Sequence, residues 1–328
     1  MKALVCKELG PTSNLVLEEL PDPVPGDREV VIRAHAAGVN FPDGLIVQGK
    51  YQTRPPLPFI PGGECAGVIT AVGAEVSHLR PGMRVMSFGT HGAFAEQVLA
   101  PAGAVMPMPD ELDFVTASAF VFVYGTSIHA LADRGGLKAG ETLLVLGAAG
   151  GVGLAAIEIG KAIGARVIAA ASSPAKLEVC KAHGADEVID YGAGDLRAQL
   201  KQFAPRGPDV VYDPVGGALT EAAFRSLAWR GRHLVIGFAA GDIPALPVNL
   251  ALLKGAALVG VFWGDHVRRE PSRAMADLIQ LLAWLRAGKL RPEITGRYPL
   301  ERGAEAIQAL LDRKVTGKLV IEMAPSAA

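Results

Sequence analysis

Cysteine is scarce in this chain: its 328 residues include only Cys6, Cys65 and Cys180. Three scattered cysteines form no CxxC pair and build no disulfide framework, which excludes a small disulfide-stapled fold. We expect the thiols to stay reduced, and this indicates a cytoplasmic protein. The four closely spaced cysteines of a structural zinc site are also missing between Cys65 and Cys180.

A strong net charge and long apolar runs are missing as well. The 32 Lys and Arg against 33 Asp and Glu give a formal charge of −1, so we expect neither nucleic acid nor an anionic membrane as partner. No apolar run reaches the ~18 residues of a membrane span. The first residues predict a strand and lack the apolar core of a signal peptide. Glycine, in contrast, is abundant at 39 residues, which suits an α/β protein with many tight turns.

The most informative segment is the glycine-rich stretch GAAGGVG, residues 147–153. It follows an apolar run, residues 142–146, and precedes a small-residue segment with a helical pattern. A strand, a glycine turn and a helix N-terminus together bind pyrophosphate, because the backbone approaches closely and offers free N–H groups. Ala148 replaces the first glycine of G-x-G-x-x-G, so this prediction depends on the order of the elements. The predicted cradle consists of Gly147, Ala148, Ala149, Gly150, Gly151, Val152 and Gly153.

An acidic residue is missing after the next predicted strand, residues 166–171. NAD sites usually place Asp or Glu there to bind the ribose 2′-hydroxyl. This chain has Ser172, Ser173 and Lys176 instead. Hydroxyls and an ammonium group can hold a 2′-phosphate, so the sequence favours NADP(H) over NAD(H). The alternative is that Ser172 caps the following helix and Lys176 is a solvated surface charge.

Strand and helix signals divide the chain into domains. Between residues 124 and 264, six strand-like segments alternate with helices, which predicts a doubly wound parallel sheet in an α/β domain. Residues 1–123 contain short β-rich runs broken by Pro and Gly, and they predict a compact, irregular β domain. Residues 265–328 are expected to return to that β domain. The six predicted strands are 143–146, 166–171, 187–191, 210–213, 233–238 and 257–263; the tail is expected to form helices over 272–287 and 298–311 and a strand over 318–322.

Several short motifs recur in a fixed order over the whole chain. They are NFPDG from Asn40, PGGECAG from Pro61, PGMRV from Pro81, the glycine turn, and TGK from Thr316. Together they resemble the zinc-independent quinone oxidoreductase (ζ-crystallin-like) branch of the medium-chain dehydrogenases/reductases. The resemblance implies a GroES-like β-rich catalytic domain plus a Rossmann domain, with the active site in the cleft between them. It also implies hydride transfer from NADPH to a quinone, and a homodimer joined through the edge strand of the Rossmann sheet. The alternative is a monomer in which residues 272–287 of the same chain cover that strand.

The zinc ligands of related dehydrogenases are missing. By the same resemblance, zinc-dependent members have a cysteine near Asn40 and a histidine where this chain has Gly63. We therefore expect no metal, and without it the stabilisation of an alkoxide during alcohol oxidation is lost. Cys65 beside Glu64 is expected to be a small buried hydrophobe.

Four residues are candidates for catalysis because the resemblance places them along the substrate cleft: Asn40, Asp43, Tyr51 and Thr126. The Asn40 amide could donate a hydrogen bond to the acceptor oxygen, and Tyr51 could stack on a quinone ring or donate its hydroxyl. Each also has a structural alternative: Asn40 can satisfy a turn, Asp43 can cap a helix, and Tyr51 can pack on a proline-rich loop. Leu45 stands where the family often has a second tyrosine, so no tyrosine acid is defined.

Further cofactor contacts are expected where strands end, because ligands bind outside the carboxyl edge of a parallel sheet. For Phe238, Phe262 and Trp263, packing in the core is the alternative. The resemblance adds Thr316 and Lys318 near the C-terminus. The predicted strand-end contacts are Tyr191, Val215, Gly237, Phe238, Phe262, Trp263 and Gly264.

These observations predict a metal-free NADPH:quinone reductase, in which the protein orients the nicotinamide and the acceptor. An alternative is reduction of α,β-unsaturated carbonyls or enoyl thioesters, with the charged run Asp265–Arg269 accepting an anionic group. An alternative of another class is a low-turnover NADPH-binding sensor or structural protein. A role in binding RNA is disfavoured because the chain has no basic stripe.

Overall fold

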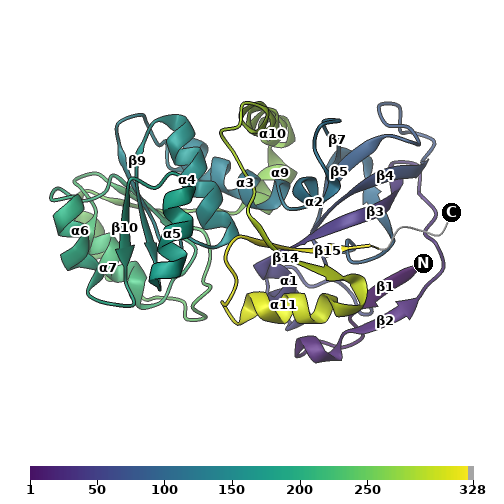
Figure 1. Ribbon diagram of the computed structural model, residues 1–328, viewed down its shortest axis with the longest axis horizontal. Coiled ribbons are helices and arrows are strands. Elements are labelled where there is room, and N and C mark those ends of the chain that lie inside the picture. Colours follow the sequence, from purple (N-terminus) through teal and green to yellow (C-terminus); the bar gives the residue numbers. More distant parts are fainter. Residues whose placement is uncertain (324–328) are drawn as a thin grey trace. The chain divides into compact units, whose positions relative to one another are not determined.

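The computed structural model describes residues 1–323, which fold into two compact units (Figure 1). Of the described residues, 1–122 and 294–323 form unit 1, and Val123–Glu293 form unit 2. The sequence pattern placed the return to the first domain at residue 265. In the structure, residues 265–293 fall in unit 2, where His266 stacks on His129 and Arg273 pairs with Asp133.

Unit 2 is built on a six-stranded parallel sheet of order β10-β9-β8-β11-β12-β13. This confirms the doubly wound α/β fold. The chain order reverses between β8 and β11, and at such a switch point the carboxyl ends of the strands open a crevice for a ligand. The first, third, fifth and sixth strands end earlier than predicted. The six strands are β8 (Thr142–Val145), β9 (Arg166–Ala171), β10 (Glu187–Asp190), β11 (Val210–Asp213), β12 (Arg232–Val235) and β13 (Ala257–Gly260).

The helices of unit 2 include the four predicted between its strands. Helix α4 ends where Gly164 adopts the left-handed conformation at φ 96°, and Asp195 caps α6 by accepting from the Ala198 N–H. Residues 249–254 and 263–269 form helices that the sequence pattern did not predict. The helices are α3 (Val121–Ile128), the π-helix η3 (His129–Arg134), α4 (Gly151–Ile163), α5 (Pro174–Ala182), α6 (Leu196–Phe203), α7 (Ala218–Ser226), α8 (Asn249–Lys254), α9 (Trp263–Arg269) and α10 (Pro271–Arg286).

Unit 1 contains a seven-stranded sheet, mostly antiparallel, in which the long strand β3 pairs with β4, β6 and β15. A separate antiparallel pair, β1 and β2, completes its strands. Figure 1 shows the late elements β14, β15 and α11 among the early ones, which closes this unit from two distant parts of the chain. The strands are β1 (Lys2–Val5), β2 (Val16–Glu19), β3 (Glu29–Val39), β4 (Glu64–Val72), β5 (Arg84–Phe88), β6 (Gln97–Pro101), β7 (Val105–Pro107), β14 (Ile294–Pro299) and β15 (Lys318–Glu322).

Three α-helices, α1 (Phe41–Val47), α2 (Phe114–Ser118) and α11 (Gly303–Leu311), accompany the sheet of unit 1. The helix predicted over residues 298–311 begins only at Gly303, because Ile294–Pro299 pairs in parallel with β15 as strand β14. The main core of unit 1 packs β3 and β15 against α11 through Val30, Ile32, Ile307 and Ile321. In the described part of the chain, no helix has both the length and the apolar character that crossing a membrane requires.

Candidate active site

The glycine turn connects β8 to α4 at the switch point of the unit 2 sheet. Gly147 has φ 55°, a left-handed conformation that favours glycine, and Val215 lies 2.7 Å from where its Cβ would stand. A Cβ at Gly153 would come within 2.6 Å of the carbonyl oxygens of Gly147 and Ala148. Gly150 occupies the N-cap of α4, and no side chain of the described residues caps it. The N-terminus of this 13-residue helix can therefore receive an anion.

The residues predicted to hold a 2′-phosphate gather at the end of β9. The Lys176 ammonium in the first turn of α5 donates to the Ser172 hydroxyl over 3.4 Å. The Tyr191 N–H donates to the Ala171 carbonyl over 3.1 Å, which sets Tyr191 beside the same strand end. Ser173, rather than Ser172, stands at the N-cap of α5. The hydroxyl and the ammonium thus form one exposed polar group.

Asp213, which ends the fourth predicted strand but is not among the predicted site residues, organises the loop after β11. Its buried carboxylate accepts hydrogen bonds from the N–H groups of Val215 and Gly216 (2.9 Å each) and from the Thr220 hydroxyl (2.7 Å). His233 Nε2 lies 3.0 Å away. Burial alone would raise the pKa of Asp213, but these partners, His233 foremost, hold it below its usual value. The motif DPVGG at a strand end was the available signal.

The aromatic residues predicted near the cofactor have different surroundings. Phe238 and Phe262 are 36% and 45% exposed, whereas Trp263 is buried. The Trp263 indole lies 2.7 Å from where a Cβ on Gly125 would stand, so it packs against α3 within unit 2. Trp263 also begins α9 rather than ending a strand. Gly237 follows β12 in a half-buried position, and Gly264 is exposed within α9.

A buried polar cluster in unit 1 joins Asn40, Glu64 and Lys318. The Lys318 ammonium donates to Asn40 Oδ1 (2.6 Å), Glu64 Oε1 (2.9 Å) and the Val39 carbonyl (3.0 Å). Asn40 Nδ2 donates to the same Glu64 oxygen over 2.9 Å. The other Glu64 oxygen accepts from the Phe122 N–H over 2.9 Å. All three ammonium donors of Lys318 are thus used inside unit 1, as is the Asn40 amide.

Asp43 lies beside this cluster at the start of α1. Its carboxylate accepts a hydrogen bond from the Asn40 N–H over 2.7 Å, the helix-capping role that was the structural alternative. Burial raises the pKa of Asp43 to about 7, against lowering contributions from the Asn40 N–H and Lys318. Tyr51 is half-buried against the unit 1 core, and burial followed by the charge of Asp43 raises its pKa. Thr126 is half-buried on α3, and Thr316 accepts a hydrogen bond from the Thr295 hydroxyl.

The raised pKa of Asp43 predicts a pH-dependent stability. Between its ordinary value near 3.8 and about 7, the folded chain keeps a proton that the unfolded chain has lost. The free energy of unfolding therefore falls as pH rises through this window, by up to about 4 kcal/mol. D43N, which mimics the protonated group, should exceed the wild type by a smaller margin near about pH 5 than near about pH 8, because the loss in the wild type grows through this window. Urea unfolding of both proteins measures this, and an equal difference at both pH values would contradict it.

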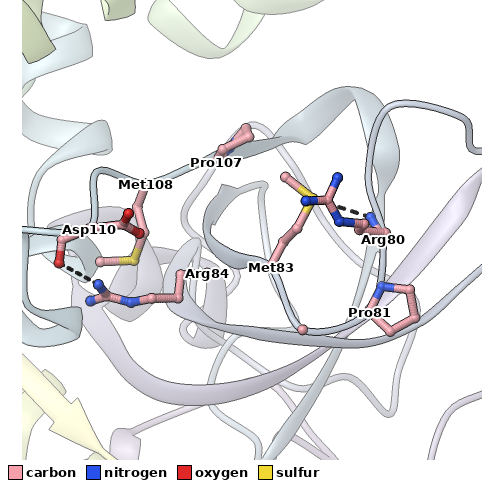
Figure 2. A pocket seen from close by; sticks show the side chains of 8 residues that line it. Arg80, Pro81, Met83, Arg84, Pro107, Met108 and Asp110 are labelled. Carbon is pink, nitrogen blue, oxygen red and sulfur yellow. Dashed lines mark hydrogen bonds between the residues drawn. The ribbon is translucent and has the colours of Figure 1, made fainter.

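A surface cavity of about 440 Å³ lies in unit 1 between the start of β5 and the end of β7 (Figure 2). Its lining residues include none of the predicted site residues. Arg84 there donates to the Leu112 carbonyl over 2.6 Å and to the Asp110 carbonyl over 2.5 Å. Both hydrogen bonds hold the backbone after β7 in place, so we assign this cavity no part in catalysis.

In the charged run 265–269, Arg268 and Arg269 both pair with Asp265, at 2.8 and 2.7 Å. His266 is buried. One carboxylate thus holds both guanidinium groups within their own helix and offsets one of their two positive charges.

Comparison with known proteins supports the same family along the whole chain. The family model described as zinc-binding dehydrogenase matches residues 151–284, and that of the alcohol dehydrogenase GroES-like domain matches residues 26–110. A quinone oxidoreductase-like protein 2 homolog of Nematostella vectensis is 36% identical over 98% of this chain and 88% of its own length.

Solved structures of similar fold support the same family. A mycobacterial protein in complex with NADPH has a TM-score of 0.92 and 31% identity, over 98% of this chain and all (100%) of that one. The Escherichia coli quinone oxidoreductase in complex with NADPH has a TM-score of 0.91 and 26% identity, with the same coverage. With a parallel sheet, a glycine turn at its switch point and a GroES-like unit, the chain belongs to the quinone oxidoreductase family of the medium-chain dehydrogenases/reductases.

Proposed function

We propose that this chain is a zinc-independent NADPH:quinone reductase. The observation that carries the proposal is the glycine turn, in which Gly147 precedes α4 and Gly153 lies in its first turn, and neither position has room for a side chain. That arrangement fits a pyrophosphate. NADPH supplies the hydride when bound. The residues around it bind and orient it: the loop held by Asp213 lies against Gly147, and Ser172 and Lys176 receive the 2′-phosphate.

The metal-free part of the proposal is supported by unit 1. A catalytic zinc needs thiolate, imidazole or carboxylate ligands around an open position. Position 63 is a glycine and position 40 an amide, and the buried Lys318 ammonium already neutralises Glu64. These residues do not fit a zinc ion. They suit an acceptor that is already activated for hydride transfer, such as a quinone. Reduction of such an acceptor does not require a metal to stabilise an alkoxide.

The role proposed for Asn40 follows from the hydrogen bonds that its amide makes within unit 1. The Asn40 amide is held by Glu64 and Lys318, so we assign it to positioning the start of α1 together with Asp43. Tyr51, which is half-buried, is the proposed donor to the acceptor oxygen. Thr126 stays a candidate on the family resemblance alone. Phe238 and Phe262, which are partly exposed, are the proposed aromatic contacts of the cofactor.

A panel of acceptors tests the substrate class. NADPH oxidation is followed with simple quinones, with α,β-unsaturated ketones and with enoyl thioesters, each at equal concentration. The proposal expects the highest kcat/KM with a quinone. Activity confined to the enones or thioesters would replace the quinone by that class, and binding of NADPH without turnover of any acceptor would favour the sensor.

Cofactor choice is expected to depend on Lys176. K176E should weaken NADPH binding roughly 10- to 100-fold, because a hydrogen bond to a charged group is lost and a like charge meets the 2′-phosphate. NADH, which has no 2′-phosphate, should bind as before. The matched control is K181E, an exposed lysine on the same helix. Fluorescence titration of both cofactors measures the effect, and equal losses for NADPH and NADH would refute the assignment.

We also propose that the chain is cytoplasmic, because a reducing cytoplasm keeps thiols free, and Cys6, Cys65 and Cys180 are free and buried in the structure.

We further propose a homodimer formed through β13. Strand β13 ends the sheet order of unit 2, and Leu258 on it is 51% exposed. An uncovered apolar edge strand invites pairing with a second copy. Leu252 and Leu253, at 79% and 65% exposed, add apolar surface on the neighbouring α8.

A charge on the edge strand tests the dimer. L258D should shift the chain from dimer to monomer, because a carboxylate would be desolvated in the interface. V24D serves as control, since Val24 is an exposed apolar residue (84%) of unit 1. Light scattering after size-exclusion chromatography gives the mass. A monomeric wild type, or an L258D protein that remains dimeric, would rule out this interface.

A further inference from the structure

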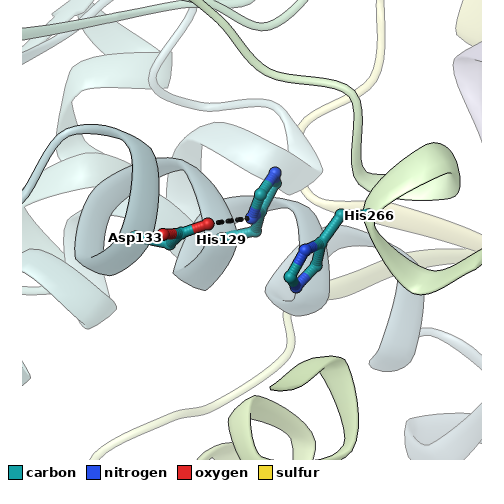
Figure 3. Close-up of side chains that lie close together, drawn as sticks. All are labelled: His129, Asp133 and His266. Atoms are coloured by element: carbon teal, nitrogen blue, oxygen red, sulfur yellow. Dashed lines mark ion pairs between the residues drawn. The ribbon is translucent and has the colours of Figure 1, made fainter. Parts of the chain in front are cut away.

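A cluster of three side chains that could bind a metal lies in unit 2 (Figure 3), and none of the three is assigned above to the cofactor or the acceptor. Its backbone adjoins one proposed cofactor contact, since the His266 N–H donates to the Phe262 carbonyl over 3.1 Å. Its members come from separate elements: His129 and Asp133 from the π-helix η3, and His266 from α9. One potential ligand atom of each lies within 4.8 Å of the other two. Figure 3 shows the two imidazole rings face to face, with Asp133 beside His129. Irregular π-turns often mark functional positions.

The hydrogen bonding of this cluster is incomplete. Neither ring nitrogen of His266 has a hydrogen-bond partner among the described residues, although its side chain is only 1% exposed. Asp277 Oδ2 on α10 also has none, and it lies 3.7 Å from His266 Nε2. Burying such groups without partners is costly. Two imidazoles and two carboxylates that face one another can all be satisfied by one cation.

We propose that His129, Asp133 and His266, with Asp277 as a fourth ligand, bind a divalent transition-metal ion such as Zn²⁺. Imidazole nitrogen and carboxylate oxygen are the ligands that zinc prefers besides thiolate. His129 Nδ1 already lies 3.0 Å from Asp133 Oδ2. That separation is close to the ~3.3 Å between two ligands of a tetrahedral zinc with bonds of about 2.0–2.2 Å.

Binding requires one local rearrangement. The two rings are stacked with their centroids 4.0 Å apart and an interplanar angle of 12°. Parallel rings cannot both point a lone pair at one ion, so the His266 ring must turn out of the stack toward Asp133. Arg273, which pairs with Asp133 Oδ1 and lies near Glu270, leaves Asp133 Oδ2 for the metal. The bound ion would connect η3 to α9 and α10, so it would stabilise unit 2 without entering hydride transfer.

Metal titration of the full chain tests the proposal. After treatment with chelator and its removal, calorimetry with ZnCl₂ should show one ion per chain. Co²⁺, used as a coloured substitute, should show the visible absorption bands of a four-coordinate site. H129Q and H266Q should each weaken Zn²⁺ about tenfold or more, because each removes a ligand. H78Q, which changes an exposed histidine of unit 1, should bind Zn²⁺ as the wild type does.

Folding of each variant is checked by circular dichroism, and the wild-type Co²⁺ spectrum supports or rejects the site even if one variant does not fold. A melting temperature raised by Zn²⁺ in the wild type and in H78Q, but not in H129Q, would be further support. The proposal is overturned if the wild type binds neither ion, or if H129Q and H266Q bind Zn²⁺ as tightly as the wild type. NADPH oxidation plays no part in these readouts, so they are independent of the proposed reductase activity.

Discussion

Replacing Gly153 by valine is expected to abolish measurable NADPH binding and to lower the stability of unit 2. A Cβ at this position would lie 2.6 Å from the carbonyl oxygens of Gly147 and Ala148, so the first turn of α4 must move away from the glycine turn. Overpacking of this kind costs about 1–3 kcal/mol of stability. Loss of two or more N–H contacts to the pyrophosphate should weaken NADPH on the order of 100-fold or more.

A second substitution in the same turn separates packing from phosphate contact. In G150A, the nearest atom to the new Cβ is the Gly147 carbonyl oxygen at 3.5 Å, an ordinary contact. G150A should therefore melt at the temperature of the wild type, while its methyl group reports how closely the phosphates approach. Thermal unfolding and fluorescence titration of both variants give the two quantities. A G153V protein that binds NADPH as the wild type does would show that the turn is not the cradle.

Replacing Lys318 by methionine is expected to cost about 3–5 kcal/mol of the free energy of unfolding. The side chains of Lys318 and Glu64 are 5% and 1% exposed, and removal of the ammonium leaves a buried carboxylate without its counterion. Asn40 would lose the partner of its Oδ1 as well. Urea denaturation at neutral pH measures the change.

The double variant and a surface control test whether the effect comes from the pair. K318M/E64Q should be more stable than K318M alone, because the neutral amide needs no counterion. K314M changes a lysine whose side chain is 79% exposed, and it should stay within about 0.5 kcal/mol of the wild type. If K318M were as stable as K314M, the buried pair of Lys318 and Glu64 would contribute nothing to the free energy of unfolding.

The sequence predicts the nucleotide-binding unit well because its signals are local. Apolar runs followed by glycine or helix patterns mark each strand of a parallel sheet, so all six strands were found in order. The ends of these strands are predicted less well than their order. The apolar pattern continues past Gly260 into residues 261–263, although the strand ladder stops there and Trp263 turns into a helix that buries its indole.

The candidate site of unit 1 depends on contacts that no local pattern contains. Lys318 and Glu64 are far apart in the sequence, and only pairing of β15 with β3, and of β3 with β4, brings them together. The family resemblance predicts Lys318 as a cofactor contact, and the sequence holds no sign that its three donors are used within the cluster. His129 and His266 meet in the same way, through folding of distant helices, and seven scattered histidines gave no signal of it.

One measurement tests the central claim, metal-free reduction by NADPH, most directly. The chain is dialysed against chelator, and the oxidation of NADPH is followed by its nicotinamide absorbance with a simple quinone, with NADH in parallel and with G153V as the inactive control. The account predicts turnover that survives the chelator, prefers NADPH and is lost in G153V. Turnover that is equally fast with NADH would contradict it, as would turnover that disappears with the chelator while circular dichroism shows the chain still folded, and that returns with Zn²⁺.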